Sequence, residues 1–219
     1  MEPVFSAELG TVSDDLVHMS RLVGSAMNRA TQALLDTDLS LAESVIAADA
    51  QIDLLANDVE EQCIQLLAEQ HLRERDLSAL LGALRIAASL ERMGDLAEHV
   101  AKQARLRYPR LSIPQELRGT FAEMGGLAEA IVSKTGAVIA TQNVNLTLDI
   151  ARHDEQMDRL HRELFTIVLT PGWSHGVEAA IDVTLLSRYY ERYADHAVSV
   201  ARRVVTIVTG APYVGVSLD

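Results

Sequence analysis

The chain has 219 residues, of which 48% are hydrophobic and only 4% aromatic, and its formal net charge at pH 7 is −12. Few aromatic residues among many Ala, Leu and Val residues favour an all-α protein and argue against a β-sandwich or barrel. The acidic balance argues against a nucleic-acid partner, because a phosphate backbone requires clustered Lys and Arg side chains.

The cellular compartment can be inferred from what the chain lacks. It has no basic N-terminal segment followed by an apolar run and no stretch of about 18 apolar residues, so neither secretion nor a membrane span is expected. The single cysteine, Cys63, excludes an intramolecular disulfide and fits a reducing compartment. We therefore expect a cytoplasmic protein that reaches a membrane only through partners.

Apolar residues spaced three and four apart predict long helices in the first half of the chain. The first helix should be about thirty residues long and end near Asp36. Asp38 or Ser40 can cap the second helix. A polar turn at residues 71–75 should precede the third helix, which runs to about Arg107.

The second half repeats this pattern after a boundary at residues 108–114, where two prolines interrupt the helical spacing. The fourth helix starts near Leu117, the fifth follows residues 143–146, and the sixth ends at Gly210. Long helices joined by short turns pack antiparallel. The sequence therefore predicts six long helices as two tandem, pseudo-symmetric three-helix bundles, residues 1–108 and 109–219.

An internal repeat places the same charged motif in both halves. The segment 91–95 (ERMGD) returns 100 positions later as 191–195 (ERYAD). On a helix, residues four apart lie about 40° apart around the axis, so both carboxylates of a motif project from one face. A second carboxylate pair with the same spacing precedes each copy, at Asp49 and Asp53 and again at Asp154 and Asp158.

Three interpretations of these carboxylates remain open. A single pair usually decorates a solvated helix face, but four pairs at matching places beside apolar stripes need another explanation. A salt-bridge network could use Lys102 and Arg202, which share the face of the carboxylates, whereas Arg92 and Arg192 should point away from it. A bound cation is favoured, and an all-carboxylate site suits magnesium, manganese, calcium or iron better than zinc.

Histidine is not part of the repeated feature. His161 and His196 lie beside Asp158 and Asp195, but the first half has Ala and Leu at those places, so structural roles are expected. A ferritin-like oxidase would need Glu-x-x-His on two helices. The chain also has no phosphate-binding loop, nucleophile elbow or Cys-His pair, so we do not expect an enzyme.

Residues 84–101 (LRIAASLERMGDLAEHVA) and 187–201 resemble the signature of the PhoU family, and the resemblance extends over nearly the whole chain. It implies two three-helix bundles, commonly in a homodimer, with multinuclear sites for iron, manganese, magnesium or zinc. The ligands implied in the first half are Asp49, Asp53, Glu91 and Asp95. Those in the second half are Asp154, Asp158, Glu191 and Asp195.

The same resemblance implies a function without catalysis. PhoU-like proteins link the ATPase subunit of the phosphate ABC transporter to a membrane sensor histidine kinase, and silence the phosphate regulon when phosphate is plentiful. The alternative function is a carboxylate-bridged metal enzyme, a phosphatase or an oxidase, built on a helical bundle.

Overall fold

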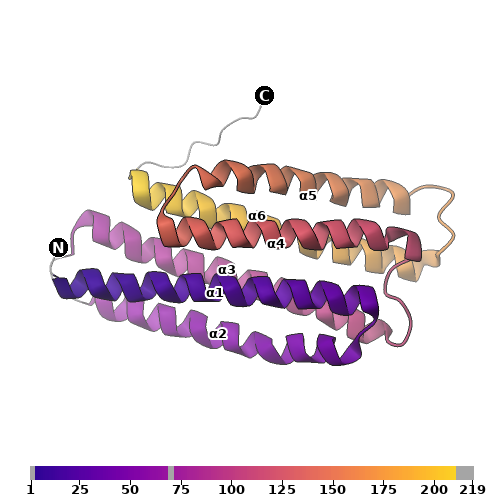
Figure 1. Cartoon of the computed structure of the whole chain (residues 1–219), viewed down its shortest axis with the longest axis horizontal. Coiled ribbons are helices and arrows are strands. Elements are labelled where there is room, and N and C mark those ends of the chain that lie inside the picture. The colour runs from indigo at the N-terminus through magenta and orange to yellow at the C-terminus, as the bar shows by residue number, and fades with distance from the viewer. Residues whose placement is uncertain (1–2, 69–71, 211–219) are drawn as a thin grey trace.

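A computed structural model describes residues 3–68 and 72–210, and within these ranges it contains helices and no strands. The all-α prediction is confirmed (Figure 1). Six α-helices and one short 3-10 helix follow in the order α1 Pro3–Asp36, α2 Leu39–Leu67, α3 Glu74–Arg107, η1 Gln115–Leu117, α4 Arg118–Thr141, α5 Leu146–Val168 and α6 Gly176–Thr209.

The helix ends in the first half follow local sequence signals. α1 ends at Asp36, as predicted, and Thr37 takes a left-handed conformation with φ of 55°. Of the two capping candidates for α2, Asp38 is the cap, because its Oδ1 accepts a hydrogen bond of 2.9 Å from the backbone N–H of Leu41. The predicted turn before α3 begins at His71, which lies outside the described residues.

The helix ends in the second half match the prediction less fully. Gly210 ends α6 in the left-handed conformation, with φ of 69°. The cap of α5 does not copy that of α2, because Asn145 occupies the cap position without a side-chain hydrogen bond to the helix. Asn143 instead accepts a 3.1 Å bond from the N–H of Asn145, which orders the turn before the helix.

The helices form two groups of three, and the groups pack directly against each other. α1, α2 and α3 contact one another, as do α4, α5 and α6, and the contacts α1–α4 and α3–α6 join the groups. In Figure 1, α2 and α5 lie on opposite outer sides of the molecule, with the other four helices between them. The division into domains 1–108 and 109–219 stays a prediction.

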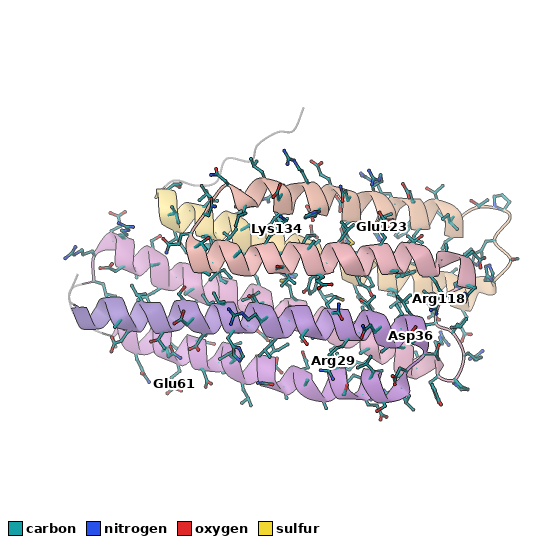
Figure 2. The ribbon with its side chains drawn as sticks, in the orientation of Figure 1. Arg29, Asp36, Glu61, Arg118, Glu123 and Lys134 are labelled. Atoms are coloured by element: carbon teal, nitrogen blue, oxygen red, sulfur yellow. The ribbon has the colours of Figure 1, made fainter. Side chains whose placement is uncertain are left out.

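Polar contacts cross between the two groups at several places, and three of them lie as follows. The hydroxyls of Thr31 on α1 and Tyr190 on α6 are 2.8 Å apart in the core. Near the end of α1, Arg118 lies 3.5 Å from Asp36 (Figure 2). The third place is the α3–α6 contact, where Asp182, with 6% of its side chain exposed, accepts two hydrogen bonds from Arg107 and one from Gln103.

The sequence alone does not explain the glycine pair Gly125–Gly126 on α4. In the structure, a side chain at the first position would collide with a neighbouring helix, whereas a side chain at the second would not. A Cβ on Gly125 would lie 2.6 Å from Cγ2 of Thr31, so this glycine lets α4 approach α1 closely. Thr31 has little freedom to move, because its hydroxyl also bonds to the backbone of Met27 and to Tyr190. A Cβ built on Gly126 would meet no side chain and no other helix within 4 Å.

These two glycines form a matched pair for mutagenesis. Gly126→Ala should stabilise the protein by about 0.5–1 kcal/mol, through helix propensity and a less flexible unfolded chain. Gly125→Ala should destabilise it, because about 1–3 kcal/mol of overpacking against Thr31 outweighs the same propensity gain. Urea denaturation measures the free energy of unfolding of both variants. Equal effects of the two substitutions would show that α4 has room for a side chain at Gly125 beside Thr31.

None of the described helices combines the length and the apolar character that a membrane-spanning helix needs.

Candidate metal centre

The first half brings three of its four predicted ligands together. Asp49 and Asp53 lie one turn apart on α2, Asp95 lies on the facing α3, and one carboxylate oxygen from each lies within 4.8 Å of the others. Gly94 allows this approach, because a Cβ there would lie 3.1 Å from Oδ1 of Asp49. Glu91 is half-buried one turn earlier on α3 and is not part of this group of three.

The Asp49 carboxyl is the most perturbed group of this cluster. Burial, followed by the negative charges of Glu98, Asp53 and Asp95, raises the pKa of Asp49 to about 6. Glu98 was missed as a member of the site. It lies on the same face of α3 three residues after Asp95, but the repeat has Val198 in its place.

The cations near the first cluster differ from the sequence expectation. Arg92 was predicted to point away from the carboxylates, but its Nη1 lies 2.7 Å from Oδ2 of Asp95. The two residues are three apart, a spacing at which helical side chains meet. Lys102 lies on the expected face and pairs with Glu98. Both pairs are partly exposed, with 64% of the Arg92 side chain and 43% of the Lys102 side chain accessible.

The second half places its carboxylates at the matching positions, on α5 and α6. Oδ1 of Asp154 and Oε2 of Glu191 are buried and have no hydrogen-bond partner among the described residues. Burial, followed by the charges of Asp158 and Asp195, raises the pKa of Asp154 to about 7. Burial likewise raises the pKa of Glu191, whose other oxygen pairs with Arg188.

The two clusters are not equivalent. Among residues 3–68 and 72–210, only Asp49, Asp53 and Asp95 bring three ligand atoms within 4.8 Å of one another. The second cluster instead contains two buried carboxylate oxygens that lack a partner among the described residues. His161 packs between α5 and α6, with its Nδ1 3.0 Å from Oγ of Ser187 and its ring against Phe165. This contact accords with a structural role for His161.

The donor chemistry of both clusters suits a hard cation, and the first cluster also brings three ligand oxygens within 4.8 Å of one another. Clustered carboxylate oxygens are the ligands that magnesium, manganese and iron prefer, and an unpaired buried carboxylate is costly without a counter-ion. In the first half Asp49, Asp53 and Asp95 would hold the ion, with Glu91 and Glu98 nearby. In the second half Asp154 and Glu191 would present their buried oxygens, with Asp158 and Asp195 beside them.

Without metal, these carboxyls should make stability fall as the pH rises. The folded-state pKa values of Asp49 and Asp154, about 6 and about 7, exceed their ordinary value of 3.8. At pH values between 3.8 and these raised pKa values, the folded state therefore binds more protons than the unfolded state. The stability that this proton binding contributes is lost as the pH rises through the folded-state pKa values.

Denaturation of chelator-treated protein at pH values from about 4 to about 8 measures this effect. Asp49→Asn/Asp154→Asn removes both groups, so its stability relative to wild type should increase across the window. A difference between variant and wild type that does not change with pH would contradict the raised pKa values.

Known proteins share both the sequence pattern and the fold described above. The PhoU domain family model matches residues 16–104 and 121–204. The chain is 46% identical to the phosphate-specific transport system accessory protein PhoU homolog 2 of Mycobacterium tuberculosis, over 96% of this chain and 99% of that protein. It is 32% identical to the PhoU homolog of Aquifex aeolicus, over 84% of each chain.

Two crystal structures have the same fold. PhoU from Pseudomonas aeruginosa superposes with a TM-score of 0.83 at 28% identity, covering 94% of this chain and 100% of that chain. The phosphate transport system regulatory protein PhoU from Streptococcus pneumoniae superposes with a TM-score of 0.85, covering 95% and 99%, and at 23% identity it supports the fold alone. The duplicated carboxylate motifs, the six-helix fold and these matches agree: the chain belongs to the PhoU family.

Proposed function

We propose that this protein is an accessory and regulatory protein of phosphate transport that acts as a metal-binding adaptor. In this role it binds the ATPase subunit of the phosphate ABC transporter and a sensor histidine kinase in the cytoplasm, and represses the phosphate regulon when phosphate is plentiful. The observation that carries the proposal is the paired carboxylate cluster, present in both halves of a chain that matches phosphate transport accessory proteins over nearly its full length.

A gene deletion tests the regulatory role. Cells that lack the protein should express phosphate-regulon genes even when phosphate is abundant, and a wild-type copy should restore repression. Asp49→Asn/Asp154→Asn should restore it poorly if metal is needed, whereas Asp58→Asn, an exposed change on the same helix as Asp49, should restore it fully. Unchanged regulon expression after deletion would refute the regulatory role.

The partners can be tested by crosslinking in phosphate-replete cells. Co-purification should recover the transporter ATPase, the kinase or both, and sedimentation should give the mass of a homodimer. If neither partner is recovered, the adaptor role fails even where the deletion phenotype is present.

The alternative function, a carboxylate-bridged phosphatase or oxidase, makes a different prediction. Metal-loaded protein would hydrolyse phosphate esters or reduce oxygen well above the solution background, and would lose this activity on Glu91→Ala. We expect no such turnover, because the family match is to accessory proteins.

A further inference from the structure

The two ends of the α3–α6 contact differ in charge although the internal repeat relates them. The helices run antiparallel, so the end of α3 meets the start of α6 at Arg107 and Asp182, and the start of α3 meets the end of α6 at Gly82 and Ile207. The offset of 100 residues relates Asp182 at one end to Gly82 at the other.

At the first end, charge is balanced within the protein. The buried Asp182 carboxylate accepts hydrogen bonds from Arg107 and a 2.7 Å bond from Gln103, and the exposed Glu178 pairs with Arg107 as well. Arg110 lies 3.8 Å from Glu178 as well, so two carboxylates and two guanidinium groups meet here, and the amide of Gln103 completes the network.

At the second end, both carboxylates are missing and an arginine replaces the amide. Gly82 stands in place of Asp182, Ser78 in place of Glu178, and Arg203 in place of Gln103. The stem of Arg203 packs beside Gly82, where its Cγ would lie 3.7 Å from an added Cβ. The guanidinium of Arg203 thus lacks the carboxylate that the repeat supplies at the first end.

A pocket of about 250 Å³ lies at this second end and is lined by two arginines from different helices, Arg85 and Arg203. Within the described part of the chain, neither guanidinium has a carboxylate within ion-pair distance or a hydrogen bond. Ser78 and Thr206 add hydroxyls to the lining, and Glu74 adds its one carboxylate. Two arginines and one glutamate leave the lining with a net charge of +1, on a chain whose net charge is −12.

We propose that this pocket binds a phosphate group. Two arginines that line one pocket repel each other unless an anion lies between them. The planar guanidinium also presents paired hydrogen-bond donors that match phosphate oxygens. The volume admits one phosphate group, and the apolar walls, which include Leu81 and Ile207, suit an organic substituent on it. The pocket is separate from both carboxylate clusters, so metal is not required for binding.

Calorimetric titration of metal-stripped, full-length protein tests the proposal, with inorganic phosphate and ADP as separate probes at low ionic strength. We expect saturable binding of at least one probe at one site per chain. Arg85→Gln and Arg203→Gln should each weaken it about tenfold or more, since each removes a charge-assisted contact. Arg105→Gln, an exposed change near the opposite end of α3, should leave affinity within about twofold.

Ser78→Glu gives an independent arm that keeps both arginines. It restores the carboxylate that the repeat has at Glu178, at an exposed position where a larger side chain is tolerated, and should compete with the ligand and abolish binding. Binding of inorganic phosphate identifies the free ion as a ligand, and binding of ADP alone identifies a phosphate ester. Saturable binding of neither probe, or binding that all three pocket variants leave unchanged, would overturn the proposal.

Discussion

Removing bound metal with a chelator should lower the melting temperature of the wild-type protein by about 5–10 °C, if the ion is present at about a hundredfold its Kd. Binding to the folded state alone at that concentration contributes about 2.7 kcal/mol, and in a chain of this size each kcal/mol shifts the melting temperature by about 2–4 °C. Adding back a divalent or ferric ion should restore the original value.

Asparagine variants show which carboxylates hold the ion whose removal lowers the melting temperature. Asp49→Asn and Asp154→Asn should each reduce the chelator response, and the double variant should remove it while melting above metal-free wild type, because desolvated like charges are gone. Asp58→Asn on the exposed side of α2 serves as the control. A salt-bridge network predicts the reverse, namely no chelator response in wild type and strong destabilisation by Asp49→Asn.

Asp182→Ala should be among the most destabilising single changes, by about 3–5 kcal/mol. It would leave Arg107, whose side chain is 16% exposed, without its main partner, and would also release Gln103. Because these bonds join α3 to α6, the loss should weaken the packing of the two halves. Chemical denaturation gives the change in free energy of unfolding directly.

Glu178→Ala is the matched control at the same cluster. Its carboxylate also pairs with Arg107 but is 60% exposed, so removing it should cost only about 0–1 kcal/mol. If Asp182→Ala and Glu178→Ala had similar small effects, the pairing at Asp182 would not hold the two halves together.

The helices could be predicted because their signals are local. The apolar stripe from Leu16 to Ala33 defines the buried face of α1, and Asp38 and Gly210 act within one turn of the ends they define. The packing of the two halves could not be predicted in the same way. The Thr31–Tyr190 hydrogen bond joins residues 159 positions apart, and a stripe does not specify which helix will cover it.

For the candidate centre, the residue spacing predicted which helices carry the carboxylates and on which face they lie. It did not predict the distances between carboxylates on different helices. The i,i+4 rule placed Asp49 and Asp53 beside the core, whereas the approach of Asp95 depends on the packing of α2 on α3 at Gly94. The internal repeat does not indicate Glu98, because the second half has Val198 at the matching position. The direction of Arg92 does not follow from its neighbour Glu91, because its side chain reaches Asp95, three residues ahead on the same helix.

Elemental analysis of native protein, purified without chelator, tests the metal centres most directly. Wild-type protein should carry bound metal in stoichiometric amounts, Asp49→Asn and Asp154→Asn should each carry less, and the double variant should carry almost none. Asp58→Asn should match wild type. Native protein without metal, or a double variant with the full wild-type content, would contradict the assignment of these carboxylates as ligands.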